Sequence, residues 1–250
     1  MGWTDIYGLM VSYNTKSFIK HVAANLNNRY SSLFSHYILL TEEMNSVVNP
    51  KKRPYIVMEA ICDRTEYQKD TTSIPKQNPR VMLYAGGIEE RYGLKMLVES
   101  FIMTEDLNAE LHIYGSGSYV DELQEKCKLD SRIKYLGVKP NSEIVAAERK
   151  ATILVNPRFT TEEFTKYSFP SKNMEYMVSG TPVLTTKLPG MPVEYNDFVY
   201  LIEEESLTGF SSAIRDVMNL HEDVLRDMGN RAKAFVLSNK NNKFLKKHII

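Results

Sequence analysis

Pro79-Arg-Val-Met-Leu-Tyr-Ala-Gly-Gly87 is the stretch of sequence that decides the fold. Its apolar run ends at two glycines, which is typical of a short buried strand followed by a tight turn. The next segment carries apolar side chains at the spacing of one helical face, namely Leu94, Leu97, Val98, Phe101 and Ile102. A buried strand that leads into an amphipathic helix is the first half of a β-α-β unit.

The same alternation of strand and helix continues to residue 237. Further strands are expected over 111–114, 133–136, 152–155, 182–186 and 199–202. One helix is expected to place Val120, Leu123 and Cys127 on a single face. Others are expected near 142–149, in the segment that ends at Gly180, and as a pair over 206–237. Short strands joined by helical crossovers form a parallel sheet covered on both faces, which binds ligands at the carboxyl ends of its strands. We therefore predict one doubly wound, Rossmann-like α/β domain over 76–237.

The sequence pattern over residues 1–75 predicts only part of a second α/β domain. A helix is expected over 14–29 and two strands over 36–40 and 54–58. The polar run 63–78 lacks periodicity and is expected to be a linker. The tail, 238–250, carries four lysines and is expected to be a solvated helix end or crossover helix rather than a membrane anchor.

Composition excludes several classes of protein. The 250 residues include 31 Lys and Arg against 31 Asp and Glu, and 43% are hydrophobic, which argues against a disordered chain and against nucleic-acid binding. No apolar run approaches a membrane span, and no basic stretch precedes the first apolar residues as in a secretory signal. Cys62 and Cys127 are too few for a disulfide framework, and the five histidines form no metal-binding cluster. We expect a soluble, cytoplasmic protein that holds no metal and no cofactor.

The segment from Asn156 to Pro182 contains the first candidate ligand site. A helix is expected to begin there at Ser168-Phe169-Pro170, with a hydroxyl cap, and to end at Gly180. The free N–H groups around Phe169–Lys172, which include that of Ser171, and the positive end of the helix dipole would form an anion site.

Glu175 lies one turn further along the same expected helix. Its carboxylate could accept hydrogen bonds from the two hydroxyls of a ribose. A phosphate at the helix start and a ribose beside it together specify a nucleotide. The alternative is that Glu175 forms a surface pair with Lys172 and that Met174 and Met177 belong to the core.

Gly86-Gly87 is a second candidate phosphate cradle. Backbone N–H groups could approach an oxyanion closely there, and Arg91 could close over it. The next glycine is Gly93, so the spacing is not that of a G-x-G-x-x-G dinucleotide fingerprint, and a dehydrogenase is disfavoured. The alternative is that these glycines serve only the turn.

Several segments over 79–237 share the order and spacing of one known family. They are Tyr84-Ala-Gly-Gly-Ile-Glu-Glu-Arg-Tyr-Gly93, Ile113-Tyr-Gly-Ser-Gly117, Leu154-Val-Asn-Pro-Arg158, Glu162-Glu-Phe-Thr-Lys-Tyr-Ser-Phe-Pro-Ser-Lys-Asn-Met-Glu-Tyr-Met-Val-Ser-Gly-Thr-Pro-Val-Leu184 and Leu188-Pro-Gly-Met-Pro-Val-Glu-Tyr195. In these segments the chain resembles glycosyltransferase family four, which has the GT-B fold, and within it the bacterial branch that builds surface polysaccharides.

The resemblance implies a nucleotide-sugar donor domain that acts with retention of anomeric configuration and without a metal. Glu175 matches the second glutamate of the family's E-x7-E signature, which binds the ribose, and Gly86-Gly87 matches the loop that contacts the diphosphate. The backbone that holds the donor's phosphate and sugar is matched by Ser168, Phe169, Pro170 and Ser171. Cations and helix dipoles would stabilise the leaving diphosphate.

The sequence departs from the family pattern at the first glutamate of the signature. That glutamate would fall at Tyr167, and Glu162 and Glu163 lie nearby but out of register. Glu163, Tyr167 and Lys172 are therefore our candidates for catalytic roles.

Two further departures remove the usual cations of the diphosphate site. Gly87 stands in place of the family's arginine, and Tyr92 stands in place of its lysine. We hypothesise that Arg158 and Lys172 replace them, with Arg91 as a further candidate, because a diphosphate in a cleft needs cations. For Arg158 the alternative is a surface charge.

The predicted function is transfer of a sugar from a nucleotide sugar, with UDP the commonest nucleotide of the family, to a glycan or lipid-linked acceptor. A GT-B enzyme needs two α/β domains and 1–75 is too short for the first, so we expect a truncated form that binds the donor and is impaired in transfer. Two alternatives stay open, a nucleotide-sugar binding fragment or subunit without transferase activity and a sugar-nucleotide epimerase. The branch also leaves open a peripheral contact with the inner membrane surface.

Overall fold

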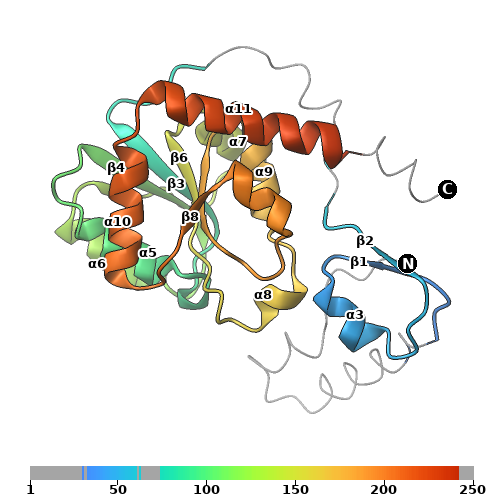
Figure 1. The fold of residues 1–250 in the computed structure, drawn as a ribbon. Helices are drawn as coiled ribbons and strands as arrows, with labels where there is room; N and C mark the ends of the chain where they lie inside the picture. The colour runs from blue at the N-terminus through green and yellow to red at the C-terminus, as the bar shows by residue number, and fades with distance from the viewer. Residues whose placement is uncertain (1–29, 31–32, 61, 63–73, 242–250) are drawn as a thin grey trace. The chain divides into compact units, whose positions relative to one another are not determined.

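The computed structural model describes residue 30 and residues 33–60, 62 and 74–241. The helix expected over 14–29 and most of the expected linker lie outside these residues. Contacts divide the chain into two units (Figure 1). The larger unit comprises the described residues of 62–159, 172–187 and 194–250, and the smaller unit comprises those of 1–61, 160–171 and 188–193.

A six-stranded parallel sheet forms the centre of the larger unit, in the order β5-β4-β3-β6-β7-β8. The strands are β3 (Arg80–Gly87), β4 (Ala109–Ser116), β5 (Ile133–Tyr135), β6 (Ile153–Asn156), β7 (Val183–Thr186) and β8 (Tyr200–Ile202). The six strands predicted from the sequence are thereby confirmed. The chain builds outward from β3 through β4 to β5, and then returns to place β6 on the other side of β3. The strand order therefore reverses between β3 and β6, and such switch points are where open α/β sheets bind ligands.

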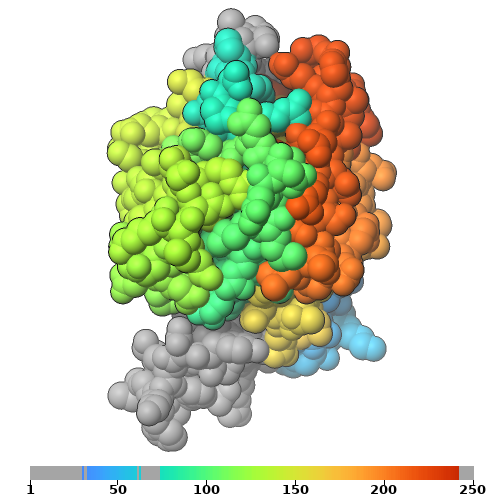
Figure 2. Space-filling view, turned by 90° about the vertical axis from the view of Figure 1, so that its left-hand side faces the viewer, coloured from blue at the N-terminus to red at the C-terminus, as the bar shows by residue number. Residues whose placement is uncertain are grey.

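Helices cover both faces of this sheet (Figure 1). On one face α5 (Leu94–Ile102) packs against α6 (Val120–Leu129) and α10 (Leu207–Met218), and Figure 2 shows the green surface of the α5 and α6 region meeting the orange-red surface of α10. On the other face lie α7 (Asn141–Lys150), α9 (Ser171–Ser179) and α11 (Glu222–Asn239). Among the described residues, no helix combines the length and the apolar character needed to cross a membrane.

The apolar stripe of α5 explains why this helix packs on the sheet. Leu94, Leu97, Val98 and Phe101 are all fully buried, in one cluster with strand residues such as Met82. Removing a buried side chain of this size typically costs about 2–5 kcal/mol. The helix spacing seen in the sequence therefore corresponds to the main core of the larger unit.

The smaller unit contains a short parallel pair of strands, β1 (Tyr37–Leu39) and β2 (Tyr55–Val57), which confirms the two strands predicted there. Among the described residues of this unit, α3 (Glu43–Val48) and α8 (Phe164–Tyr167) are helical and contact each other. The core consists of Tyr37, Leu39, Met44 and Val48. Residues 160–171 and 188–193, which the sequence assigned to the donor domain, group with this unit.

The helix expected to begin at Ser168 begins instead at Ser171, so that prediction was wrong by three residues. Ser168 is extended and closes α8, which occupies part of the segment expected to be a loop. The reason is Pro170, because the ring of a proline disfavours helical backbone at the residue before it, here Phe169. The hydroxyl of Ser168 is therefore not in place to cap the helix that carries Glu175.

Candidate functional site

The glycine loop at the end of β3 lies at the carboxyl edge of the sheet. Gly86 and Gly87 are paired in register with Gly115 and Ser116 at the end of β4. Gly115 has a φ of +133°, and an added Cβ there would lie 1.8 Å from the carbonyl oxygen of Gly86. The two strand ends can approach this closely only because one of them is glycine. The loop is thereby held in one conformation with its backbone at the edge.

Two buried tyrosines support this loop from within the unit. The Tyr84 hydroxyl donates to the carbonyl of Gly87 at 2.7 Å. The Tyr176 hydroxyl, on α9, accepts from the N–H of Ala85 at 3.0 Å and donates to its carbonyl at 3.2 Å. Burial raises the pKa of both phenols, so both hydroxyls keep their protons and can donate. Tyr176 therefore joins α9 directly to the end of β3.

A chain of buried polar side chains holds α9 over the neighbouring strands. The amide of Asn156, at the end of β6, donates to Asn173 Oδ1 at 2.7 Å. The amide of Asn173 in turn reaches the hydroxyl of Thr185 on β7 at 3.3 Å. Since all three residues are buried, removing one member would leave another polar group without a partner. The first turns of α9 are thus fixed relative to β6 and β7.

Lys172 and Glu175 face solvent on α9. Lys172 Nζ lies 2.8 Å from Glu175 Oε2, and the Glu175 side chain is 55% exposed. Met174 and Met177 are buried. This is the surface pair that the sequence offered as the alternative to ribose binding. The carboxylate is nevertheless open to a ligand, because an exposed pair of this kind is weak and is readily exchanged.

Arg91, Tyr92 and Arg158 come together at the switch point between β3 and β6. Tyr92 belongs to the short 3-10 helix η1 (Glu90–Tyr92), which follows the β3 loop. The guanidinium carbon of Arg91 lies 4.9 Å from the centre of the Tyr92 ring, and that of Arg158 lies 5.1 Å from it. Two positive charges predicted separately from the sequence therefore lie against one aromatic ring.

Glu148 on α7 is a titratable group that no motif in the sequence singles out. Its side chain is 3% exposed. Burial raises the pKa of Glu148 to about 7, with the charge of Lys172 opposing the shift and that of Glu175 adding to it. A third charged group thus interacts with the Lys172–Glu175 pair. In the sequence, Glu148 is a carboxylate in the second half of an amphipathic helix. That pattern does not distinguish a buried glutamate from a solvated one.

The other six predicted residues belong to the smaller unit. Glu163 lies exposed just before α8, and Tyr167, at the end of α8, packs against the Tyr37 cluster. Phe169 is buried, and its carbonyl accepts a hydrogen bond from the N–H of Ser171 at 2.8 Å. The remaining two residues are Ser168, which is partly buried, and Pro170, which is buried. Their roles in catalysis and donor binding stay predictions.

The family model described as glycosyl transferases group 1 matches residues 65–235. The chain belongs to this family. As a group 1 glycosyltransferase, it is 24% identical over 209 residues to N-acetyl-alpha-D-glucosaminyl L-malate synthase of Bacillus anthracis, covering 79% of this chain and 52% of that protein. It is 23% identical over 194 residues to WcaL of Salmonella typhimurium, whose name assigns it to colanic acid biosynthesis, covering 75% of this chain and 48% of that protein. The chain thus spans about half the length of these curated relatives.

Solved structures show the fold of this family member. The structure of Anabaena Alr3699/HepE in complex with UDP and glucose matches with a TM-score of 0.69 at 16% identity, covering 99% of this chain and 70% of that one. The Rossmann-like parallel α/β domain predicted from the sequence is that of a GT-B glycosyltransferase. Within residues 30, 33–60, 62 and 74–241, no three His, Cys, Asp or Glu side chains are grouped so that they could hold a metal ion.

Proposed function

We propose that the larger unit binds the nucleotide-diphosphate part of a sugar donor at the switch point between β3 and β6. The observation that carries this proposal is the convergence of Arg91 and Arg158 on Tyr92, beside the Gly86-Gly87 loop. A rigid glycine loop offers backbone N–H groups, and two guanidinium groups supply positive charge where a diphosphate would need it. UDP is the proposed nucleotide, which the UDP bound to the Anabaena protein supports.

In this proposal the Lys172–Glu175 pair opens when the donor binds. Glu175 would accept hydrogen bonds from the two ribose hydroxyls, and Lys172 would turn to the diphosphate. Opening the pair costs little free energy, because each partner replaces a weak solvent-exposed contact with a contact to the ligand. The sequence places Ser168–Ser171 immediately before these residues, and we propose that their backbone contributes to the phosphate and sugar site.

The chemistry that follows is transfer of the sugar with retention of configuration. The bond between the anomeric carbon and the diphosphate oxygen breaks, and a bond from the anomeric carbon to the acceptor's hydroxyl oxygen forms on the same face. Negative charge grows on the leaving diphosphate oxygen, which takes up the proton that the acceptor hydroxyl loses. Arg91, Arg158 and Lys172 would stabilise that charge more strongly in the transition state than in the bound donor, which lowers the barrier without a metal. Glu163 and Tyr167 are proposed to act nearer the sugar.

The acceptor is proposed to be a glycan or lipid-linked saccharide in polysaccharide assembly, which the name of the Salmonella relative supports. A cytoplasmic location and a peripheral contact with the inner membrane surface belong to the same proposal. Because the chain spans about half of its curated relatives, donor binding and sugar transfer are separate questions. Nucleotide-sugar binding without transfer is the second candidate function.

Titration calorimetry with UDP, GDP and ADP tests the donor site. We expect UDP to bind, and Glu175→Ala to weaken binding by about tenfold, since it removes hydrogen bonds from a charged acceptor to the ribose. Glu125→Ala is the matched control, because Glu125 forms the same i,i+3 pair with Lys128 at 2.6 Å on α6.

The control should bind UDP within about twofold of the unmodified protein, since a surface pair away from the ligand contributes little. Absence of binding by all three nucleotides, or equal binding by the two variants, would contradict the proposed donor site. Incubation of the protein with a UDP-sugar and a lipid-linked saccharide, followed by a search for the lengthened saccharide, then separates transfer from binding alone.

A further inference from the structure

We propose that Tyr92 is a positioning residue that holds the guanidinium groups of Arg91 and Arg158 together for the donor's diphosphate. This inference rests on the proposed function and extends it, because it assigns a role to a residue that carries no charge. The observations that carry this inference are the contacts of the Tyr92 ring with Gly87 at the end of β3, with Arg91 in η1 and with Arg158 just beyond β6.

The Tyr92 ring lies directly against the glycine loop. An added Cβ on Gly87 would lie 3.0 Å from Tyr92 Cε2, so the ring occupies the space that a side chain at position 87 would need. Gly93, with a φ of +80°, ends η1, and an added Cβ there would lie 1.8 Å from the carbonyl oxygen of Pro157. The first contact places the ring against the end of β3, and the second holds the backbone of the next residue, Gly93, against the backbone just beyond β6.

Arg91 is held by both the face and the hydroxyl of this ring. Its Nη2 donates to the Tyr92 hydroxyl at 3.0 Å, and its guanidinium carbon lies 4.9 Å from the ring centre. Among the residues that the structure describes, Arg91 forms no ion pair. Its positive charge is therefore oriented by Tyr92 and not neutralised by a carboxylate.

Arg158 reaches the same ring from a different strand. Its backbone is anchored where the Thr186 hydroxyl donates to the Arg158 carbonyl at 2.5 Å, just beyond β6. Its guanidinium carbon lies 5.1 Å from the centre of the Tyr92 ring. Loops from two neighbouring strands thus deliver one arginine each to a single aromatic residue.

The ring offsets the cost of holding two like charges near each other. A guanidinium group is weakly hydrated and stacks favourably on aromatic faces. Holding the two flexible side chains in advance also lowers the entropy lost when a ligand orders them. A diphosphate carries two adjacent negative groups, so it matches a pair of fixed cations better than a single one does.

The test is calorimetry with two ligands, UDP and uridine, on the full chain. We expect Tyr92→Leu to weaken UDP binding by about tenfold, and Tyr92→Phe, which keeps the ring and loses the hydroxyl, by about twofold to threefold. Uridine lacks phosphate, so both variants should bind it within about twofold of the unmodified protein. A residue that only maintained the fold would change the binding of both ligands.

Two further sets of variants keep the proposal falsifiable if Tyr92→Leu does not fold. Arg91→Lys and Arg158→Lys keep the charge and lose the planar stacking group, and each should weaken UDP binding by about fivefold. Phe198→Leu is the matched control, because Phe198 stacks with Arg231 at 5.8 Å elsewhere in the larger unit, and it should leave UDP binding unchanged.

The possible outcomes separate the two proposals. If the unmodified protein binds no UDP, the donor site itself is wrong. If UDP binds and Arg91→Ala and Arg158→Ala weaken it, but Tyr92→Leu and the two lysine variants do not, the donor site stands and the role of Tyr92 is overturned. Equal weakening of UDP and uridine by Tyr92→Leu would also overturn it.

Discussion

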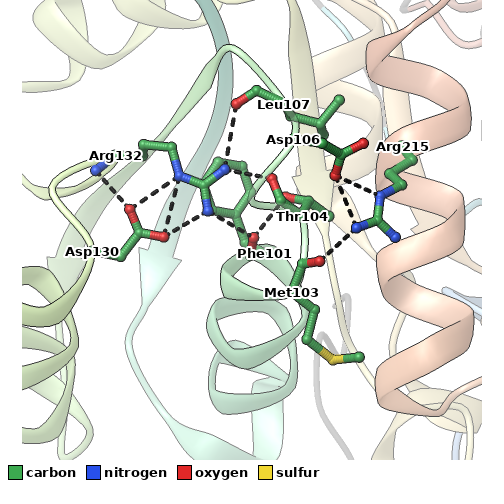
Figure 3. A network of polar contacts seen from close by, with 8 residues as sticks. All are labelled: Phe101, Met103, Thr104, Asp106, Leu107, Asp130, Arg132 and Arg215. Carbon is green, nitrogen blue, oxygen red and sulfur yellow. Dashed lines mark hydrogen bonds and ion pairs between the residues drawn. The ribbon is translucent and has the colours of Figure 1, made fainter.

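Two groups of arginines in the larger unit differ in what their guanidinium groups contact. Arg132 and Arg215 converge on the end of α5, where they donate to carboxylates and to backbone carbonyls (Figure 3). Arg91 and Arg158 instead stack on Tyr92 at the carboxyl edge of the sheet. The first group bonds its charge to carboxylates and carbonyls of the fold, and the second stacks on one aromatic ring at the edge of the sheet. Under the proposed function, the first group stabilises the protein and the second binds the donor.

The first group has a clear structural task. Arg132 donates to the carbonyl of Phe101 in the last turn of α5 and to that of Thr104 just beyond the helix, while it also pairs with Asp130 at 2.7 Å. Arg215 does the same for Met103 while it pairs with Asp106 at 2.9 Å. Positive charge at this position also complements the helix dipole. The network therefore closes α5 at its carboxyl end.

The largest effect on stability is expected for Arg132→Ala. It would remove the charged partner of the largely buried Asp130 carboxylate and the side-chain donor to the carbonyls of Thr104 and Leu107, and should lower the free energy of unfolding by about 4 kcal/mol. Arg158→Ala should lower it by less than about 1 kcal/mol. Urea unfolding of both variants measures the difference, and similar losses would contradict the division between the two groups.

Two carboxylates contribute to stability with opposite dependences on pH. The hydrogen bond from Arg132 lowers the pKa of Asp130, whereas burial raises the pKa of Glu148 from 4.5 to about 7. An acid with a raised pKa binds its proton more tightly in the folded protein, so its contribution to stability falls as pH rises from about 4.5 to about 7. For Asp130 the pH dependence has the opposite sign, because its contribution to stability is lost as pH falls below the ordinary pKa of an aspartate.

Glu148→Gln should therefore stabilise the protein at pH 8 by up to about 3 kcal/mol and have no effect at pH 4. Asp130→Asn should destabilise it at pH 7. Chemical unfolding at the two pH values measures both effects. A Glu148→Gln variant that is less stable at pH 8 would show that the carboxylate is well compensated in the folded state.

A smaller effect is expected at the tyrosine that joins α9 to β3. Tyr176→Phe removes two hydrogen bonds to the backbone of Ala85 and should cost about 1.5 kcal/mol. Tyr200→Phe is the matched control, because the buried Tyr200 hydroxyl has no hydrogen-bond partner among the described residues. Thermal unfolding of the control should show no loss, and equal losses would mean that the Tyr176 hydrogen bonds add nothing.

Much of the fold could be predicted because strands and helices have local signatures. The run Val81 to Ala85 and the stripe that contains Leu97 and Phe101 identify β3 and α5 without knowledge of their neighbours. The start of α9 at Ser171 follows from Pro170, which restricts Phe169, and this restriction overrides the capping preference of the Ser168 hydroxyl.

The candidate site was predictable only in part. Gly86, Gly87, Arg91 and Arg158 could be proposed because they follow strand ends, and Lys172 and Glu175 because they lie in the first turns of a helix. Tyr92 and Tyr176 could not, because an aromatic residue on a helix is usually interpreted as core. Glu148 could not, since its burial depends on how α7 packs on the sheet and not on its neighbours in sequence.

The amino-acid sequence alone determined that this protein contains a parallel, doubly wound sheet and which loops lie at its carboxyl edge, because hydrophobic period and glycine position act over a few residues. The tertiary structure alone decided that β3 and β6 are neighbours, and therefore that Arg91 and Arg158 share one aromatic ring. Such a meeting has no local signature, since it arises from the order in which strands pair and the order is set by packing across the whole unit.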